Sequence, residues 1–319
     1  MKIAIVLFNL GGPDSLQAVQ PFLRNLFSDP AIIALPSWLR LPLASLIARR
    51  RTPKALRIYE QIGGGSPILG QTEAQARALE EVLSADNTCE WRGYVCMRHW
   101  HPLTETVARS IHRFAPDRIV LLPLYPQFST TTTASSVKAW RKAAHFKIPT
   151  VAIDSYPTEP GFIAASVELV KQGLAEAGSG PKRLLFSAHG LPERIVKAGD
   201  PYREQVEQTA KAIAARLGDV DWSVCYQSRV GPLKWIGPST DSEIARAAHE
   251  QVGIVLYPLS FVSEHSETLV ELDIDYRRLA TEAGAPVYVR VPTVGTHPLF
   301  IRGLADLVRA ALAPPVKAA

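Results

Sequence analysis

Acidic side chains recur every four residues in the segment "SEHSETLVELDIDY" (Ser263–Tyr276), which has the polarity pattern of a helix. Glu267, Glu271 and Asp275 would lie one above another, because residues i and i+4 share a helical face. Like charges at this spacing destabilise an isolated helix by about 0.2–0.5 kcal/mol per pair. A ladder of carboxylates beside His265 therefore points to a function that outweighs this cost, such as the passage of protons or cations.

The spacing of the acids also predicts a departure from ideal α-helical geometry. On a helix with 3.6 residues per turn, a step of four residues drifts by about 40°. A π-bulge, which widens a helix and is common at functional sites, would bring the acids closer to one line. We therefore expect π-type widening near Glu267–Glu271. A solvated polar face is the alternative interpretation, and it applies to Asp275 more than to Glu267.

A second candidate for proton chemistry is His189, which ends the apolar run Arg183–His189 and is followed by Gly190. An isolated histidine is more often structural than a ligand. The end of a buried strand, however, is where α/β folds bind ligands. An imidazole there could accept protons near neutral pH. Together with the carboxylates it would also suit a divalent first-row metal that must arrive and leave.

The elements that must position these residues alternate between strands and helices along the chain. The predicted strands are Lys2–Asn9, Trp91–Met97, Arg118–Tyr125, Thr150–Asp154, Arg183–His189, Trp222–Gln227, Gly253–Leu259 and Val287–Val291. The predicted helices are Ser15–Phe27, Thr72–Leu83, Leu103–Phe114, Ser135–His145, Gly161–Ala177, Pro201–Leu217, Asp241–Gln251, His265–Ala283 and His297–Ala311. Such alternation is typical of parallel sheets covered by helices. We therefore expect an α/β fold of two lobes, 1–155 and 156–319, with a cleft between them.

Hydroxyl side chains are dense in "YPQFSTTTTASS" (Tyr125–Ser136), directly after the third predicted strand. One or two of them are expected to cap the following helix. The others could line a polar pocket or hold a carboxylate. The turns "NLGGPDS" and "IGGGSP" carry neither GxGxxG nor a following Lys-Ser/Thr, so they predict tight turns rather than a nucleotide site.

The composition is that of an ordinary globular protein. The chain has 319 residues, 47% hydrophobic and 20% charged, with a net charge of +5. It has no Lys/Arg-rich tail and no nucleic-acid motif, so a nucleic-acid partner is not expected. Its three cysteines form no CxxC pair, which fits a reduced, cytoplasmic protein. The N-terminus lacks a small-residue cleavage site and predicts a strand rather than a signal peptide.

Several motifs, in this order, resemble those of ferrochelatases over nearly the whole chain. They are "LFNLGGPDSLQAVQPFLRNLFSDP", "RRRTPK", "YEQIGGGSPI", "HPLTE", "LYPQFSTTTTASS", "SAHGLPERIVKAGDPY", "QSRVGPLKWIGPSTD" and "SEHSETLVELDIDY". The resemblance implies two Rossmann-like lobes, each a four-stranded parallel sheet flanked by helices. It also implies insertion of Fe²⁺ into protoporphyrin IX to form protohaem, with release of two protons. Fe²⁺ would be a substrate and no cofactor would be required. Three scattered cysteines cannot supply the four thiolates of a [2Fe–2S] cluster.

The resemblance also implies roles for individual residues. His189 in "SAHGLP" matches the histidine proposed as iron ligand and proton acceptor, and Glu267 in "SEHSETL" matches the catalytic glutamate. At His99 many relatives have tyrosine, which leaves details of the pocket open. The expected relay residues are Glu264, His265, Glu271 and Asp275. The expected porphyrin contacts are Leu10, Arg98, His99, Tyr125, Ser129, Thr130 and Trp235.

The segment "AIIALPSWLRLPLASLIARRR" (31–51) is similar to the lip over the cleft in this family. The lip residues that could guard the porphyrin and touch a membrane are Leu35, Trp38, Leu39, Leu43 and Ile47. The arginine triplet 49–51 could pair with anionic headgroups. Core packing is the alternative. We expect a monomer or weak homodimer with peripheral contact to a membrane surface.

Three alternative functions remain open at this point. A coproporphyrin chelatase or a cobalt chelatase would share the fold and much of the site. A non-catalytic tetrapyrrole carrier would need the cleft but not His189 with the acid ladder. The apolar lip favours protoporphyrin over the more polar coproporphyrin.

Overall fold

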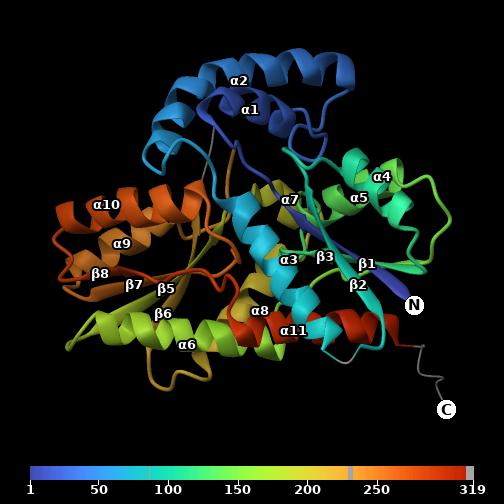
Figure 1. The fold of residues 1–319 in the computed structure, drawn as a ribbon. Helices are drawn as coiled ribbons and strands as arrows, with labels where there is room; N and C mark the ends of the chain where they lie inside the picture. The colour runs from blue at the N-terminus through green and yellow to red at the C-terminus, as the bar shows by residue number, and fades with distance from the viewer. Residues whose placement is uncertain (86, 229–232, 314–319) are drawn as a thin grey trace.

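Two four-stranded parallel sheets form the frame of the computed structural model, which describes residues 1–85, 87–228 and 233–313 (Figure 1). The first sheet, in the order β2-β1-β3-β4, contains β1 (Lys2–Asn9), β2 (Glu90–Met97), β3 (Arg118–Pro123) and β4 (Thr150–Ala152). The second sheet, in the order β6-β5-β7-β8, contains β5 (Lys182–His189), β6 (Asp221–Gln227), β7 (Gly253–Pro258) and β8 (Tyr288–Arg290). All eight predicted strands are present, so the expected two-lobed α/β fold is confirmed.

Helices cover both faces of each sheet. They are α1 (Val19–Phe27), α2 (Ser37–Glu60), α3 (Ile68–Ser84), α4 (Thr104–Phe114), α5 (Thr133–Ala143), α6 (Pro160–Glu176), α7 (Glu193–Lys197), α8 (Tyr202–Ala214), α9 (Thr240–His249), α10 (Tyr276–Glu282) and α11 (Pro298–Leu312). A short 3₁₀ turn, Leu16–Ala18, precedes α1, and a π-helix, Glu267–Asp275, precedes α10. Alternate residues of β1 pack against different layers: Ile3 and Ile5 share a core with α3, whereas Ala4 and Val6 share one with α4 and α5.

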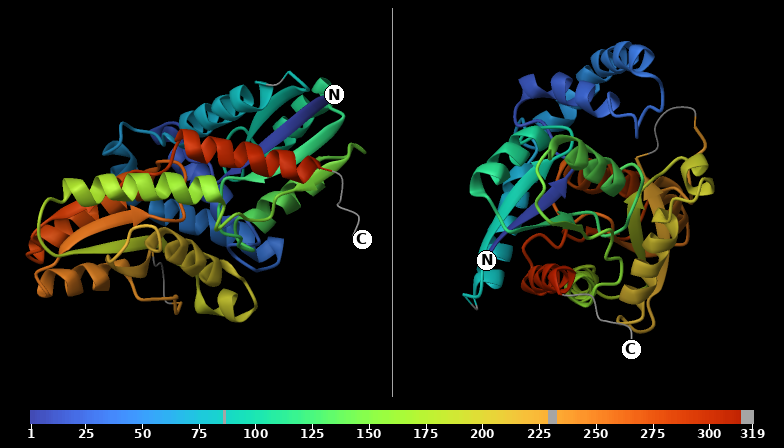
Figure 2. Two further views of the ribbon diagram at one scale, coloured as in Figure 1. Left: turned by 90° about the horizontal axis from the view of Figure 1, so that it is seen from below. Right: turned by 90° about the vertical axis from the view of Figure 1, so that its right-hand side faces the viewer.

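The two lobes share one continuous core, in which α6 and α11 lie against each other (Figure 2). The rings of Phe162 and Phe300 are 5.9 Å apart between centroids. Close approach of the helices depends on Gly161 and Gly303, because a Cβ at Gly161 would lie 3.0 Å from the Gly303 Cα. The sheets divide on either side of residue 155, yet α11 from the second half of the chain also contacts α3, β3 and β4.

The predicted lip, 31–51, comprises the turn after α1 and the first part of α2, and these two helices lie beyond the sheets (Figures 1 and 2). Helix α2 was not predicted from the sequence and continues through Pro42 and Pro53. Packing of Ala48 and Tyr59 against α1 accounts for the continuation of α2 past both prolines. Its outer side exposes large apolar residues, most of all Trp38, whose exposed fraction is 72%. Over the described residues, no helix combines the length and apolarity needed to cross a bilayer.

Candidate active site

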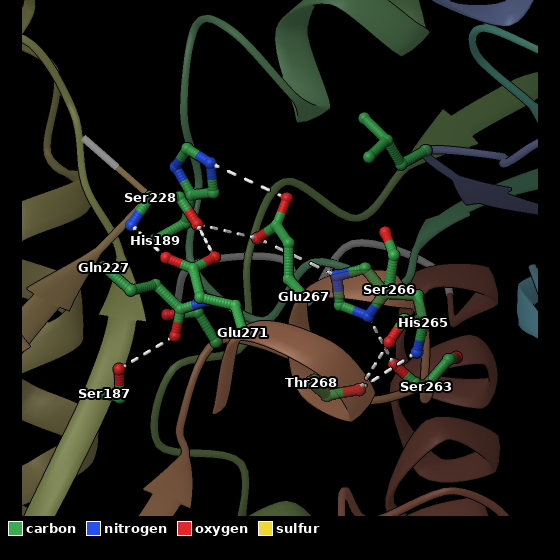
Figure 3. A network of polar contacts seen from close by, with 12 residues as sticks. Ser187, His189, Gln227, Ser228, Ser263, His265, Ser266, Glu267, Thr268 and Glu271 are labelled. Atoms are coloured by element: carbon green, nitrogen blue, oxygen red, sulfur yellow. Dashed lines mark hydrogen bonds and ion pairs between the residues drawn. The ribbon is translucent and has the colours of Figure 1, made fainter. Parts of the chain in front are cut away.

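The acidic motif follows β7 and adopts the π-helical form that its spacing predicts. The π-helix runs from Glu267 to Asp275, so the expected widening is confirmed and extends over the whole ladder. Just before it, the Thr268 hydroxyl accepts a hydrogen bond from the His265 N–H at 3.0 Å. The widened helix projects Glu267 and Glu271 toward the carboxyl ends of β5 and β6 (Figure 3).

His189 ends β5 and faces Glu267. Its Nδ1 lies 2.6 Å from the Gly190 carbonyl oxygen, which can only accept a hydrogen bond, so Nδ1 must carry the proton. In the neutral ring this leaves the Nε2 lone pair free, 3.9 Å from Glu267 Oε1 (Figure 3). The His189 side chain is 39% exposed and the Glu267 side chain 25% exposed, so an incoming ligand can reach both. The pair can accept a proton or supply one nitrogen and one oxygen ligand to a metal ion.

Glu267 lies between two histidines. Its second oxygen is 3.9 Å from His265 Nε2, and His265 donates through Nδ1 to the Ser263 carbonyl at 3.1 Å. Burial alone would raise the pKa of Glu267, but His189 and His265 outweigh it and lower that pKa below its usual range. Burial likewise opposes protonation of His265, yet the hydrogen bond and charge of Glu267 raise its pKa above 6.5. Glu267 is therefore held as a carboxylate.

Glu271 is held by a residue that the sequence analysis did not single out, Ser228. The Ser228 backbone N–H donates to Glu271 Oε1 at 2.9 Å, and its hydroxyl donates to Oε2. Ser228 follows β6 with φ of 61°, a left-handed conformation that is uncommon for residues other than glycine. Tyr276 donates to the same carboxylate at 3.2 Å. The signal for Ser228 was its place after a predicted strand within "QSRVGP", a motif that also includes residues 229–232, outside the described residues.

The pKa values of the two inner acids move in opposite directions. Burial, followed by the neighbouring charge of Glu267, raises the pKa of Glu271, and the Ser228 hydrogen bonds oppose this only in part. Two carboxylates that differ in this way divide acid and base roles between them. Glu267, whose pKa is lowered, is suited to bind a cation, whereas Glu271, whose pKa is raised, is suited to accept a proton.

The other predicted relay residues occupy different surroundings. Asp275 is 47% exposed and lies 3.4 Å from Arg278, at the outer end of the ladder. Glu264 is paired with Arg290 at 2.7 Å and accepts the Thr293 N–H at 2.9 Å, so the structure does not place it against Glu267. Within residues 1–85, 87–228 and 233–313, no group of three or more His, Cys, Asp or Glu side chains has the arrangement of a metal site.

The first lobe positions the acidic motif of the second. Gln75 of α3 donates to the Val262 carbonyl at 2.7 Å and accepts the Ser263 hydroxyl at 2.9 Å. Gln71, one turn earlier, accepts the Glu264 N–H at 3.2 Å. Gln75 is fully buried, so its amide is a specific link and not a solvated surface contact. The loop 262–264, which precedes the π-helix, is therefore held by two glutamines from the opposite lobe.

Residues expected at the porphyrin lie at the ends of β1, β2 and β3. Leu10, at the end of β1, is half-buried, and its carbonyl accepts the His99 N–H at 3.0 Å. Arg98, after β2, pairs with Asp29 at 2.8 Å. His99 is only 1% exposed, and burial lowers its pKa to about 3. A direct contact of His99 with porphyrin stays a prediction.

Ser129 and Thr130 hold a carboxylate from the other lobe, one of the two roles expected for the hydroxyl run. Asp200 accepts the Ser129 hydroxyl at 3.0 Å and both the N–H and the hydroxyl of Thr130 at 2.7 Å. Trp235 pairs through its backbone with Pro192, in the loop after His189. Tyr125 is half-buried beside Ser136, and the porphyrin contacts of all these residues stay predictions.

The chain matches known proteins over nearly its whole length. The ferrochelatase family model matches residues 2–312. A ferrochelatase of Caulobacter vibrioides (strain NA1000 / CB15N) is 57% identical over 311 residues, covering 97% of this chain and 90% of the relative. A ferrochelatase of Phenylobacterium zucineum is 53% identical over 315 residues, covering 98% of this chain and 92% of the relative. A solved structure of SirB from Bacillus subtilis with Fe³⁺ shares the fold, with a TM-score of 0.55 at 14% identity over 98% and 96% of the two chains. The chain belongs to the ferrochelatase family.

Proposed function

We propose that this ferrochelatase inserts Fe²⁺ into protoporphyrin IX at the His189–Glu267 pair, with iron as a substrate and no resident cofactor. The observation that carries this proposal is the approach of the His189 Nε2 lone pair to within 3.9 Å of an ionised Glu267. Insertion exchanges two pyrrole protons for one metal ion. A neutral imidazole accepts protons, and a carboxylate balances the charge of an arriving dication.

Proton release would run outward along the π-helix. Each pyrrole N–H bond that breaks leaves its electron pair on the porphyrin, which becomes a dianion and binds Fe²⁺. His189 accepts the proton, and Glu271, whose pKa is raised, is the next acceptor within the described site. Asp275 at the exposed end of the ladder then transfers protons to solvent. Glu264 and His265 would contribute beside this path, Glu264 from its ion pair with Arg290 and His265 from its contact with Glu267.

The wall of the cleft would assist by binding a bent porphyrin. A planar free base hides its nitrogen lone pairs from an approaching ion, whereas a bent one already resembles the transition state. Leu10 would support one face of the macrocycle opposite His189, and Arg98, His99, Tyr125 and Trp235 would line the rim.

The lip would make peripheral contact with a membrane surface. Trp38, Leu35 and Leu39 are exposed, as a membrane-facing role requires, whereas Leu43 and Ile47 are half-buried and suit a role toward the cleft. Exposed aromatic and aliphatic residues followed by arginines are typical of helices that bind the interfacial region. We place the protein in the cytoplasm, as a monomer or weak homodimer, at such a surface.

Anaerobic incubation with protoporphyrin IX and Fe²⁺, Co²⁺ or Zn²⁺, followed by the Soret band, tests the function. We expect Fe²⁺ insertion by the native chain and at least a 100-fold lower rate for His189→Ala, because general acid–base groups contribute about 10²–10⁴-fold. Porphyrin binding, measured by fluorescence quenching, should persist in this variant. The matched control is His249→Ala, an exposed histidine of α9.

Each other outcome of the assay contradicts part of the proposal. Near-normal turnover of His189→Ala would overturn the role of His189. Insertion of Co²⁺ without Fe²⁺ would identify a cobalt chelatase, and binding without any metallation would identify a carrier. Faster insertion into coproporphyrin than into protoporphyrin would reassign the substrate.

A further inference from the structure

A buried carboxylate, Asp29, joins the start of the lip to Arg98, which follows β2, and to Ser135 of α5. Asp29 lies between α1 and α2, and its side chain is 2% exposed. Its Oδ2 accepts the Arg98 guanidinium at 2.8 Å and the Ser135 hydroxyl at 2.6 Å. Its Oδ1 accepts the Ala31 N–H at 2.9 Å. Residues from three distant parts of the chain thus meet on one side chain.

The contacts around Asp29 form a closed network. Arg98 also donates through Nε to the Ser135 hydroxyl oxygen at 2.8 Å, so the guanidinium, the hydroxyl and the carboxylate bond to one another. Charge-assisted hydrogen bonds with a guanidinium fix its plane as well as its position. These bonds occupy two of the five Arg98 N–H groups, and the Arg98 side chain remains 22% exposed. Part of the Arg98 side chain can therefore be reached by a ligand.

The backbone around Asp29 also orders the chain that leads into α2, next to the Ala31 N–H that the carboxylate accepts. Backbone N–H groups of Ile32 and Ile33 both donate to the Asp29 carbonyl at 3.0 Å. Arg40, in the second turn of α2, donates through Nε to the Ser28 carbonyl at 2.9 Å. The turn 28–33 is therefore tied to Arg98 on one side and to α2 on the other. A change of the Asp29 side chain acts on this turn through two bonds, those to Arg98 and to the Ala31 N–H.

We propose that Asp29 is a positioning residue that holds Arg98 and the turn 28–33, which leads into α2, in a fixed arrangement. Capture of the porphyrin then depends on a carboxylate that does not itself touch the substrate. This inference rests on the proposed function, because it takes Arg98 as part of the porphyrin wall. It assigns Asp29 to binding of the macrocycle and not to the metal-insertion step at His189 and Glu267.

Asp29→Asn tests the proposal, because it keeps the shape of the side chain and removes the charge. We expect the KM and the Kd for protoporphyrin to rise at least tenfold, with kcat within threefold of the native value. Amide hydrogen exchange should accelerate over 28–41 and stay unchanged in the π-helix. Asp306→Asn on α11, an exposed acid paired with Arg309, is the control and should change none of these quantities.

Ser135→Ala separates positioning from a general loss of structure. If the network acts as a unit, the Kd increase from Ser135→Ala should shrink at least threefold in the Asp29→Asn background, since contacting residues are not additive. Independent, multiplicative effects would overturn the proposal. A fall in kcat at constant KM, or unchanged KM and Kd, would overturn it too. Porphyrin binding is read without iron, so failure here is distinct from failure of the native chain to insert Fe²⁺.

Discussion

Glu267 and Glu271 show how two like residues, one turn apart, acquire different chemistry. Two histidines lower the pKa of Glu267, whereas burial and the charge of Glu267 raise that of Glu271. Ser228, in a left-handed conformation, supplies the hydrogen bonds that hold Glu271 in this environment. Repulsion between neighbouring carboxylates, which destabilises an isolated helix, here adds to burial in raising the pKa of Glu271 beside the ionised Glu267.

His99 should make the stability of the protein depend on pH. Burial and the Arg98 charge outweigh Asp29 and hold the pKa of His99 near 3 in the folded state, against the ordinary 6.5 of a solvent-exposed histidine in the unfolded chain. Below pH 6.5 the unfolded chain therefore binds a proton at His99 that the folded chain does not, so stability is lost as pH falls toward 3. Between pH 7.5 and 5 this amounts to about 2 kcal/mol.

His99→Gln should remove this part of the pH dependence. Urea unfolding at pH 7.5 and pH 5 should show a smaller loss of free energy of unfolding in the variant than in the native chain. His249→Gln, which alters a histidine exposed on α9, should leave the native difference unchanged. Equal pH dependence of the native chain and His99→Gln would contradict the prediction, whatever the absolute stability of the variant.

At the scale of the elements, the contact between α6 and α11 holds the two lobes to one core. Gly303→Ala would place a Cβ among the Glu159 side-chain atoms at the start of α6. Glu159 caps that helix by accepting the N–H groups of Gly161 and Phe162. We expect a loss of about 1–3 kcal/mol in the free energy of unfolding, because overpacking forces neighbouring atoms to shift.

A second glycine provides the control for this substitution. Gly70 lies in α3 with nothing within 4 Å of the position of its absent Cβ. Gly70→Ala should leave stability unchanged or raise it by up to about 1 kcal/mol, because alanine restricts the unfolded chain. The same urea titration serves both variants. Equal effects of the two substitutions would show that the helix contact is not what requires glycine at position 303.

At the scale of the whole molecule, the lip stands apart from the sheets while its base is tied through Asp29 to Arg98, which follows β2. Arg51 packs over the Phe27 ring, 5.6 Å from its centroid, whereas Arg49 and Arg50 are exposed. Charges near an anionic surface contribute about 1 kcal/mol each, so Arg49→Gln with Arg50→Gln should weaken binding to phosphatidylserine vesicles about tenfold or more. Co-sedimentation measures this, and added salt should reduce native binding.

Two exposed arginines on another face give the matched control for membrane binding. Arg109 and Arg113 of α4 are exposed, and replacing both with glutamine makes the same change in net charge. Only the substitutions in α2 should weaken vesicle binding if the lip faces the membrane. Equal weakening by both pairs would mean that attraction depends on net charge alone, and unchanged binding in the α2 variant would contradict the role of the arginines.

The sequence by itself determined the order of the eight strands and of most helices, the positions of His189 and Glu267 at or after strand ends, and the π-helix. It could do so because apolar period, strand length and the four-residue spacing of acids are local properties. Tertiary structure alone decided which distant residues meet. Ser228 reaches Glu271, Gln75 holds the loop before the π-helix, and Asp200 takes up the hydroxyls expected at the porphyrin.

Helix α2 was missed for a related reason. Its two prolines argue locally against a continuous helix, and only packing on α1 overrides them. Likewise, the pKa values of Glu267, Glu271 and His99 depend on burial and on charges supplied by other elements. A linear pattern records which groups are present, while their desolvation and partners are set by contacts between residues far apart in the chain.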